Sequence, residues 1–331
     1  MSGTAEEAVA FVEAPARLHF GMLDLRGDLG RRFGGIGAAV PSPSLLVEVA
    51  SAPPGVFEGS GPEADRALDF ARRYLAHEGI DGGASVHVHR AIPAHAGLGS
   101  GTQLALAVAR ALATLHGRPE EPTALARAVE RARRSAIGTY TFAAGGLVVE
   151  GGRRDGADAP APLIARLAVP AAWHCVVAVP RGQPGVSGEA EAAAFAALPA
   201  PPRAEVERVA HVVLLRLLPS VAEGDVAGFG AALTEVQEVT GRWWAPVQGG
   251  TYAPGATESV VRAMRAWGAL GVGQSSWGPA AYAVVEGAAA GAALAREVRS
   301  AVGEGGRVFE GPFASEGARV WRAPRRRAPS R

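Results

Sequence analysis

Apolar and polar residues along the chain recur with two periods, one typical of strands and the other typical of helices. Val86 and Val88 alternate with His87 and His89, which predicts a half-buried strand and explains the histidine spacing without a metal ion. Residues 62–77 carry apolar side chains three and four positions apart, which predicts a helix with one buried face. The same patterns predict strands over residues 10–20, 45–49, 146–150, 175–179 and 282–286, and helices over residues 102–116, 122–134, 204–218, 226–239, 257–267 and 288–302.

The predicted elements indicate an α+β fold in two domains. Strands and helices mix without a regular β–α–β alternation, which disfavours a doubly wound parallel sheet. A chain of 331 residues is long for a single hydrophobic core and suits two packed units. We expect one domain over residues 1–160 and a second over residues 161–322. Residues 323–331 are rich in arginine and proline and are expected to form a disordered basic tail.

Composition and charge narrow the function classes. Apolar residues make up 48% of the chain, all of the basic residues are arginine and the net charge is +1, so no overall field favours nucleic acid or a membrane. The single cysteine, Cys175, lies in an apolar run and is expected to be a buried, inert thiol. The first ten residues lack the features of a secretory signal, so we expect a cytoplasmic protein that acts on small molecules.

A glycine-rich segment at residues 93–102 carries the strongest sign of chemistry. It follows a predicted strand and opens a predicted helix. Glycines allow the backbone to turn tightly beside a ligand, and the free N–H groups at a helix start favour an anion. A phosphate or diphosphate is therefore the expected ligand. The residues expected to hold it are His95, Gly97, Leu98, Gly99, Ser100, Gly101, Thr102 and Gln103.

Three segments together resemble the GHMP kinases. Residues 93–102 are similar to the phosphate-binding loop of that family, residues 14–21 resemble its N-terminal motif, and residues 271–278 take the place of its C-terminal glycine motif. The resemblance covers nearly the whole chain. It implies a GHMP-kinase fold with an N-terminal ribosomal-S5-like domain and a C-terminal ferredoxin-like domain.

One departure from the kinase pattern concerns the catalytic base. The aspartate position of the family is Gly138, seven residues before Gly145, and no carboxylate occurs between Glu130 and Glu150. A kinase needs a group that orients or deprotonates the attacking hydroxyl. Ordinary kinase activity is therefore not expected.

The departures match one branch of the superfamily, the β-ribofuranosylaminobenzene 5′-phosphate synthases. The chain resembles that branch at residues 17–25, 27–34, 97–103 and 273–279. The resemblance implies condensation of phosphoribosyl pyrophosphate (PRPP) with an aromatic carboxylate and release of CO2 and pyrophosphate. Because loss of CO2 restores aromaticity, the attacking ring carbon needs no general base. The enzyme must instead stabilise the leaving diphosphate and orient two anionic substrates.

The resemblance and the residue types together suggest roles for individual side chains. Arg17, His19 and Asp24 are expected to act in catalysis, Asp24 and Asp28 to offer oxygen ligands to Mg2+, and Arg31 to clamp a phosphate. Turn and cap roles for the aspartates and exposed positions for the arginines stay open as alternatives. The acceptor is expected to contact Trp244, Gln248, Gly249, Gln274, Ser275, Ser276 and Trp277.

Two aromatic carboxylates remain as candidates for the acceptor. An arginine-only composition and Ala136 in place of a usual glycine favour an aminopyrazole dicarboxylate of C-nucleoside antibiotic biosynthesis. The alternative is 4-aminobenzoate, as in methanopterin biosynthesis. A small-molecule kinase with an unusual base and a non-catalytic phospho-sugar-binding protein are more distant hypotheses. The resemblance also implies a homodimer.

A set of arginines is predicted to lie apart from this chemistry. Arg127, Arg131 and Arg134 fall at helical spacing, which predicts a solvated face of the helix expected over residues 122–134.

Overall fold

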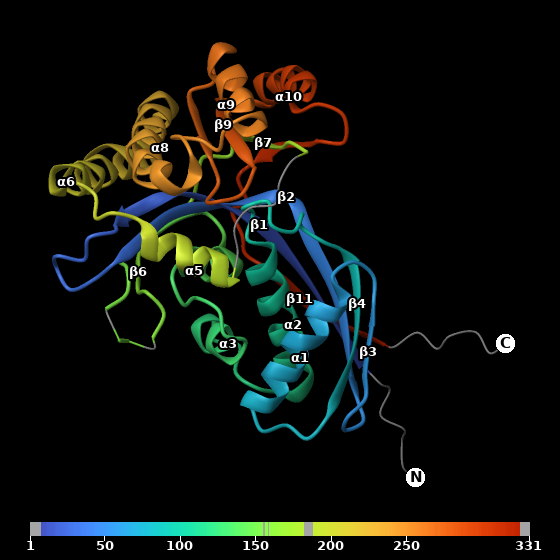
Figure 1. The fold of residues 1–331 in the computed structure, drawn as a ribbon. Coiled ribbons are helices and arrows are strands. Elements are labelled where there is room, and N and C mark those ends of the chain that lie inside the picture. Colours follow the sequence, from blue (N-terminus) through green and yellow to red (C-terminus); the bar gives the residue numbers. More distant parts are fainter. Residues whose placement is uncertain (1–7, 155, 158, 182–187, 325–331) are drawn as a thin grey trace, which may run out of the picture.

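Two sheets, each covered by helices, make up the computed structural model of the protein (Figure 1). The structure describes residues 8–154, 156–157, 159–181 and 188–324. Helices and strands alternate irregularly along the chain, and the predicted α+β class is confirmed. None of the helices in these described ranges is long and apolar enough to cross a bilayer.

The first sheet has seven strands and contains both the earliest and the last strand of the described chain. Its main path runs β11–β1–β2–β4–β3, and β5 extends the sheet from β2 to β6. Only β3 and β4 run parallel to each other among these pairs. The strands are β1 (Ala8–Asp24), β2 (Phe33–Ala52), β3 (Phe57–Ser60), β4 (Gly83–Arg90), β5 (Leu147–Glu150), β6 (Leu163–Leu167) and β11 (Arg319–Pro324).

Helix α2 (Ser100–His116) is the buried axis of this first half. Its alanine and leucine residues are almost all inaccessible, as expected for a helix that is apolar around its whole circumference. It packs on β1 and β2 and against α1 (Ala64–His77), which also covers β4. The shorter helices α3 (Pro122–Ala128) and α4 (Ile137–Ala144) complete the layer. The start of α2 therefore has a fixed position at the end of β1.

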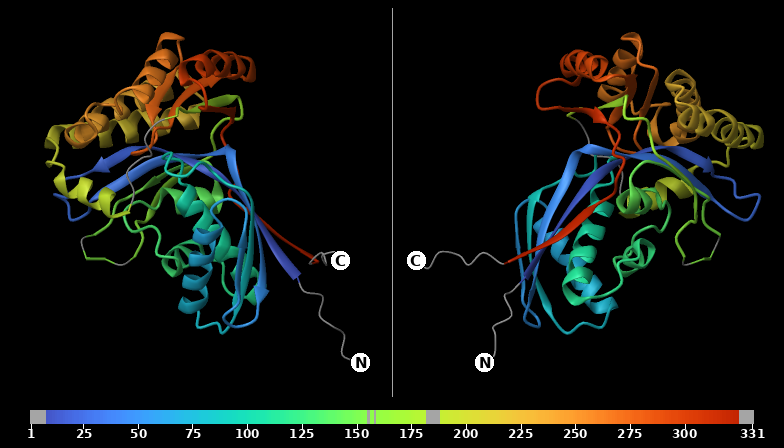
Figure 2. Two further views of the ribbon diagram at one scale, coloured as in Figure 1. Left: turned by 45° about the vertical axis from the view of Figure 1, so that its right-hand side comes forward. Right: turned by 180° about the vertical axis from the view of Figure 1, so that it is seen from behind.

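The second sheet has the order β10–β7–β9–β8 and lies beside the first, with its helices on the outside (Figure 2). Helix α8 packs on β8 and also reaches β1. This contact joins the two halves where the functional residues gather. The strands are β7 (Trp173–Val179), β8 (Gly271–Gln274), β9 (Ala281–Glu286) and β10 (Arg307–Pro312); the helices are α5 (Gly188–Ala197), α6 (Arg203–Val212), η1 (Val213–Leu217), α7 (Leu218–Glu223), α8 (Val226–Gln248), α9 (Ala256–Ala266) and α10 (Ala288–Val302).

Several predicted boundaries differ from the structure. The helix predicted over residues 122–134 ends at Ala128, and α4 and α5 were not predicted because they are short and nearly uniformly apolar. Helix α8 continues to Gln248, nine residues past the predicted end. Ala323 and Pro324 belong to β11 and not to a disordered tail, since that strand pairs with β1; residues 325–331 lie outside the described ranges.

Candidate active site

Two glycine segments from opposite halves of the chain contact each other beside Arg17 and His19 of β1. Gly97 has a φ of +80°, and a Cβ there would lie 2.0 Å from the carbonyl oxygen of Ser275. A Cβ on Gly278 would lie 2.1 Å from the Gly97 nitrogen, so both positions exclude side chains. The Ser275 hydroxyl donates to the Gly97 carbonyl at 2.7 Å and accepts from the His19 N–H at 3.0 Å. Buried Ser275 therefore ties the predicted phosphate loop to β1 and β8.

The start of α2 offers backbone donors beside two arginines. Gly99 begins the helix without a side-chain cap, and the first turn contains no acidic residue. A Cβ on Gly101 would lie 2.1 Å from Nη2 of Arg66 and 3.3 Å from Nη2 of Arg131, so both guanidinium groups lie against this turn. Each also lies over the ring of Phe70, which holds its plane in place. Helix start and arginines together favour an anion.

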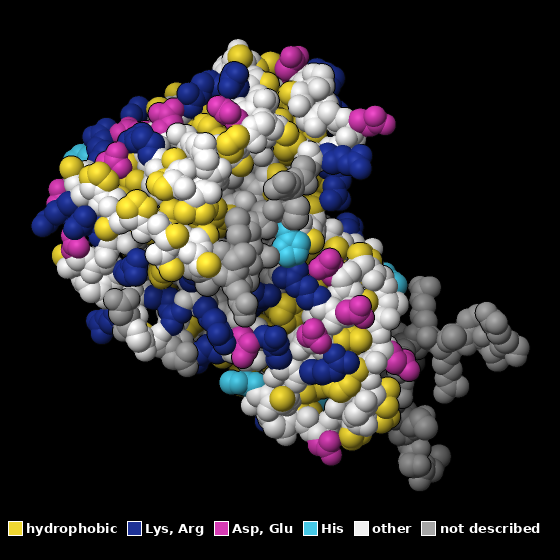
Figure 3. Space-filling view, viewed as in Figure 1, with side chains coloured by type: hydrophobic (Ala, Val, Ile, Leu, Met, Phe, Trp, Pro, Cys, Tyr) yellow, Lys and Arg dark blue, Asp and Glu magenta, His cyan; other side chains and the backbone are white. Residues whose placement is uncertain are grey.

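A cavity of about 360 Å³ opens in front of this turn, and we call it the arginine cavity. Among the described residues, four arginines from two separate segments and one carboxylate, Glu130, line it. Glu130 is itself paired with Arg73 at 2.5 Å and Arg133 at 3.4 Å. Figure 3 shows basic side chains gathered on this face between the two halves of the molecule. The lining residues are Arg17, His19, Met22, Thr102, Glu130, Arg131, Ala132, Arg133, Arg134, Ser135, Phe195 and Ser276.

The prediction that Arg131 and Arg134 form a solvated helix face is wrong. The helix has ended before them, and Glu130 and Ala132 adopt left-handed φ values of 56° and 58°. This irregular backbone turns the arginines into the cavity, where the Arg134 guanidinium lies 5.3 Å from the ring of Phe195. The spacing of the arginines cannot reveal the left-handed conformation of Glu130 and Ala132, so it wrongly predicted a continuous helix.

Arg17 and His19 lie together on β1, as predicted. Arg17 Nη1 donates to the Gly97 carbonyl at 2.5 Å, and its side-chain carbons cross directly over Gly99. His19 is 5% exposed, and its Nε2 has no hydrogen-bond partner within the described residues. Burial, followed by the positive charge of Arg17, lowers the pKa of His19 to about 3. The imidazole is therefore neutral at physiological pH.

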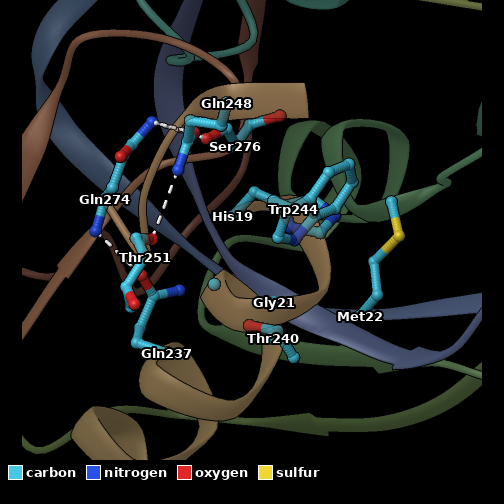
Figure 4. Close-up of a pocket in the computed structure, with 11 residues that line it drawn as sticks. His19, Gly21, Met22, Gln237, Thr240, Trp244, Gln248, Thr251, Gln274 and Ser276 are labelled. Carbon is cyan, nitrogen blue, oxygen red and sulfur yellow. Dashed lines mark hydrogen bonds between the residues drawn. The ribbon is translucent and has the colours of Figure 1, made fainter. Parts of the chain in front are cut away.

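A second, smaller pocket adjoins the arginine cavity, and we call it the amide pocket because three glutamines line it (Figure 4). Its volume is about 30 Å³. His19, Met22 and Ser276 line both spaces, so the pocket and the cavity meet there. The remaining lining residues are Gly21, Gln237, Thr240, Gly241, Trp244, Gln248, Thr251 and Gln274.

Hydrogen bonds hold the three glutamine amides of this pocket in fixed orientations. Gln274 donates through Nε2 to Oε1 of Gln248 at 2.9 Å and accepts from the Ala253 N–H at 2.7 Å. The Gln237 carbonyl oxygen accepts from the Gln274 N–H at 2.8 Å. Gln248 and Gln274, which the sequence predicts for an acceptor site, both line this pocket. Gln237 lines it as well and was not predicted, because its place in the period of α8 resembles a core position.

Two tryptophans predicted for the acceptor site lie at this pocket, one in its lining and one packed against the first. Trp244 lines it, and buried Trp277 packs edge-on against Trp244 with ring centroids 4.1 Å apart. Phe195 from α5 completes this aromatic cluster. Gly249 ends α8 with a φ of 91° and lines neither space.

Several predicted ligand residues have other partners. Asp24 Oδ1 accepts the N–H groups of Arg26 at 2.6 Å and Gly27 at 3.1 Å, and Asp28 pairs with Arg26 at 2.8 Å. Within the described ranges no three His, Cys, Asp or Glu residues cluster as metal ligands. Both aspartates therefore hold this loop together, and their role as Mg2+ ligands stays a prediction.

Of the other residues predicted to bind the diphosphate, some lie beside the arginine cavity and some do not. Arg31 donates to the Gly152 carbonyl at 3.1 Å, Leu98 lies in the core, and Gln103 donates to the Gly138 carbonyl at 2.9 Å. His95 is exposed and lines neither space. Ser100 and Gly101 form the first turn of α2 beside the cavity, and Thr102 lines it.

Comparison with known proteins shows the family to which the chain belongs. Residues 64–146 match the N-terminal domain of the GHMP kinases. A protein of Methanothermobacter thermautotrophicus named β-ribofuranosylphenol 5′-phosphate synthase is 36% identical over 294 residues, which cover 83% of this chain and 88% of the relative. The chain belongs to the β-ribofuranosylphenol 5′-phosphate synthase family. The branch predicted from the sequence motifs is thereby confirmed.

A second member of the β-ribofuranosylphenol 5′-phosphate synthase family, from Archaeoglobus fulgidus, is 33% identical and covers 89% of this chain and 93% of its own length. A solved homoserine kinase from Cytophaga hutchinsonii shares the fold with a TM-score of 0.69 at 18% identity, covering 97% of this chain and 99% of its own length. The GHMP-kinase fold is therefore confirmed, and family membership confirms an enzyme of the glycosyltransferase type.

Proposed function

We propose that the protein joins C1 of ribose 5-phosphate from PRPP to the carboxylate-bearing ring carbon of a benzoate, with release of CO2 and pyrophosphate. One observation carries this proposal: the arginine cavity and the amide pocket share His19, Met22 and Ser276. A highly charged substrate and a small aromatic one would meet at that boundary.

The arginine cavity supplies what a departing diphosphate requires. Arg17, Arg131 and Arg134 line it, and Thr102 brings the first turn of α2 to the same space. Charge-assisted hydrogen bonds from guanidinium groups to phosphate are among the strongest in proteins, and they strengthen as negative charge develops. Mg2+ is proposed to arrive with the diphosphate as part of the substrate, because Asp24 and Asp28 are engaged elsewhere.

The amide pocket favours an acceptor with one small polar substituent. A volume of about 30 Å³ holds a hydroxyl or amino group but not a whole ring. The ring would then lie at the boundary beside Trp244, with its substituent among Gln237, Gln248 and Gln274. The relatives are named for a ribofuranosylphenol product, which corresponds to a 4-hydroxybenzoate acceptor. These names favour 4-hydroxybenzoate or 4-aminobenzoate over an aminopyrazole dicarboxylate.

The chemistry can proceed without a proton acceptor at the reacting carbon. The C1–O bond of PRPP breaks, and pyrophosphate leaves with the electron pair. The π electrons of the ring carbon form the new bond to C1. The electron pair of the breaking C–CO2 bond then restores the aromatic ring as CO2 departs. Protein side chains bind, orient and screen charge in each step.

The structure around the absent kinase aspartate agrees with this reaction. A Cβ on Gly138 would lie 3.0 Å from Cγ2 of Thr102, and the Gly138 carbonyl accepts from Gln103. The position where a kinase carries its base is thus filled by backbone and a methyl group.

Mass spectrometry tests the proposal directly. The purified protein is incubated with PRPP and Mg2+ and, separately, 4-hydroxybenzoate, 4-aminobenzoate and 4-aminopyrazole-3,5-dicarboxylate, while pyrophosphate is measured. We expect a C-riboside with loss of CO2 from one of the two benzoates. Product from the pyrazole alone would overturn the acceptor assignment, and phosphate transfer from ATP to an alcohol without any riboside would overturn the reaction. Light scattering on the same sample tests the predicted homodimer.

A further inference from the structure

A buried carboxyl group lies behind the boundary of the two spaces. Glu150 is the last residue of β5 and pairs in register with Gly35 of β2. Its side chain is fully inaccessible. Oε2 accepts the Gly152 N–H at 2.8 Å, whereas Oε1 has no hydrogen-bond partner within the described residues. Such an atom calls for a structural reason, because the large majority of buried polar atoms in proteins are hydrogen-bonded.

The unpaired oxygen and the unpaired nitrogen of His19 lie beside the same position, the Cα of Gly35. A Cβ on Gly35 would lie 3.1 Å from Glu150 Oε1 and 3.4 Å from His19 Nε2. The absence of a side chain at Gly35 therefore leaves one gap, flanked by both polar atoms and by Cγ1 of Ile137. Two buried atoms without partners, one on β1 and one on β5, approach each other across a glycine.

We propose that Glu150 is a positioning residue that accepts a hydrogen bond from the His19 Nε2–H group through one water molecule. The inference rests on the proposed function for its catalytic meaning. The bond would fix the proton on Nε2, so the Nδ1 lone pair would face the substrates. Capping of this turn, with Gly152, Ala136 and Ser135 as donors, accounts for the carboxyl but leaves the His19 nitrogen without a partner.

The tautomer matters because positive charge develops at C1 of the ribose as pyrophosphate leaves. A neutral imidazole that presents a lone pair adds no positive charge at this point, and the negative end of its dipole faces C1. The opposite tautomer would present an N–H group and oppose the same charge. Glu150 would act through His19 without contacting either substrate.

The residues around Glu150 and His19 determine the pH at which the proposed hydrogen bond forms. Burial raises the pKa of Glu150 to about 7, against the opposing effects of the Gly152 and Ala136 N–H groups and the Ser135 hydroxyl. On the His19 side, Arg17 is the charged neighbour. The carboxylate form, which accepts from Nε2–H, therefore predominates above about pH 7. We expect kcat to rise with pH through this range.

The test is Glu150→Gln in the full-length protein. The amide oxygen of the introduced side chain keeps the bond from Gly152, while its NH2 group replaces the accepting oxygen. The water molecule would then donate to His19 Nε2, and the imidazole proton would move to Nδ1. Nitrogen-15 NMR of histidine-labelled protein reports the tautomer, with the His19 signal assigned from a His19→Asn sample. We expect the tautomer to switch, kcat to fall roughly 100-fold, the KM for PRPP to stay within about twofold, and the rise in kcat near pH 7 to vanish. Exposed Glu286, replaced by glutamine, is the matched control.

Unchanged tautomer and kcat in the Glu150→Gln variant would overturn the proposal, as would a lower kcat with an unchanged tautomer and pH profile. Gly35→Ala is a second variant, because its methyl group would enter the gap and is expected to disturb the same tautomer without removing a charge. If the wild-type protein forms no riboside at all, the proposed function fails. The NMR comparison still decides whether Glu150 and His19 are paired.

Discussion

The side chain of Arg17 crosses directly over Gly99 before its guanidinium reaches the Gly97 carbonyl. A Cβ on Gly99 would lie 2.8 Å from Cγ of Arg17, and Arg17 Nη1 donates to Gly97 at 2.5 Å. The arginine thus supports the loop from one side and lines the arginine cavity with its charge. The path of the Arg17 side chain therefore requires a glycine at position 99, and the loop in turn is held by Arg17.

Replacing Arg17 by alanine is expected to lower kcat/KM for PRPP by roughly 100-fold or more, because a phosphate-facing charge and a loop support are lost together. Steady-state kinetics with pyrophosphate release measures the effect. The matched control is Arg262→Ala, which removes an exposed arginine paired only with Glu258 on the same helix. Equal kinetics in the two variants would contradict a role for Arg17.

Arg131→Ala and Arg134→Ala are each expected to raise the KM for PRPP about tenfold and to change the KM for the benzoate much less. Both side chains face the arginine cavity, whereas the amide pocket does not include them. Arg72→Ala is the control, since that side chain pairs with Asp69 on the surface of α1. A larger effect on the benzoate than on PRPP would place the acceptor in the arginine cavity.

Gln248→Leu is expected to raise the KM for the aromatic acceptor about tenfold, because the leucine cannot hydrogen-bond a polar ring substituent. It also removes the acceptor oxygen for Gln274 Nε2, which retains the carbonyl oxygen of Gly278 at 3.1 Å. The KM for PRPP should stay unchanged. Kinetics with each substrate varied in turn measures this difference, and a rise for PRPP alone would contradict the assignment of the pocket.

Gly278→Ala is expected to destabilise the protein by about 3 kcal/mol, because its Cβ would enter the backbone of Ala96 and Gly97. Denaturant unfolding measures the change. Gly311→Ala is the control, since a Cβ there meets only Pro41 Cγ at 3.9 Å. Similar unfolding midpoints for both variants would show that close contact between the two glycine segments does not contribute to stability.

His19 is expected to make stability depend on pH. Its pKa is about 3 in the folded protein and 6.5 when exposed, so between these values the unfolded chain binds the additional proton. The free energy of unfolding therefore falls as the pH falls from about 6.5 towards 3. His19→Asn should lose this part of the dependence in unfolding curves measured at several pH values. An unchanged pH dependence in that variant would contradict the buried neutral state.

Most of the fold and half of the site were predictable from local patterns. The strand–glycine–helix order at residues 93–102 and the placement of Arg17 with His19 follow from periodicity and motif. Gln248 and Gln274, predicted together, do line one pocket. These features are encoded within short stretches of chain, where backbone preference and side-chain alternation act directly.

The parts that were missed depend on contacts between distant segments. Arg66 is 35 residues from Gly101 in sequence but lies against it, and Phe195 reaches the cavity from a helix with no clear period. Glu150 was seen in the sequence only as a boundary of a carboxylate-free stretch, because its pairing with Gly35 depends on the order of strands in the sheet. The aminopyrazole acceptor was favoured by composition, which carries no information on pocket size.

The pairing of β11 with β1 has a consequence for synthesis of the protein. Phe11 stacks on Trp321 with ring centroids 5.4 Å apart, and residues 8–13 pair with residues 319–324. One edge of β1 therefore has no partner until residues 319–324 have left the ribosome. During translation that edge is open to other strands, and chaperone binding to the nascent amino-terminal segment would protect it until the closing strand arrives.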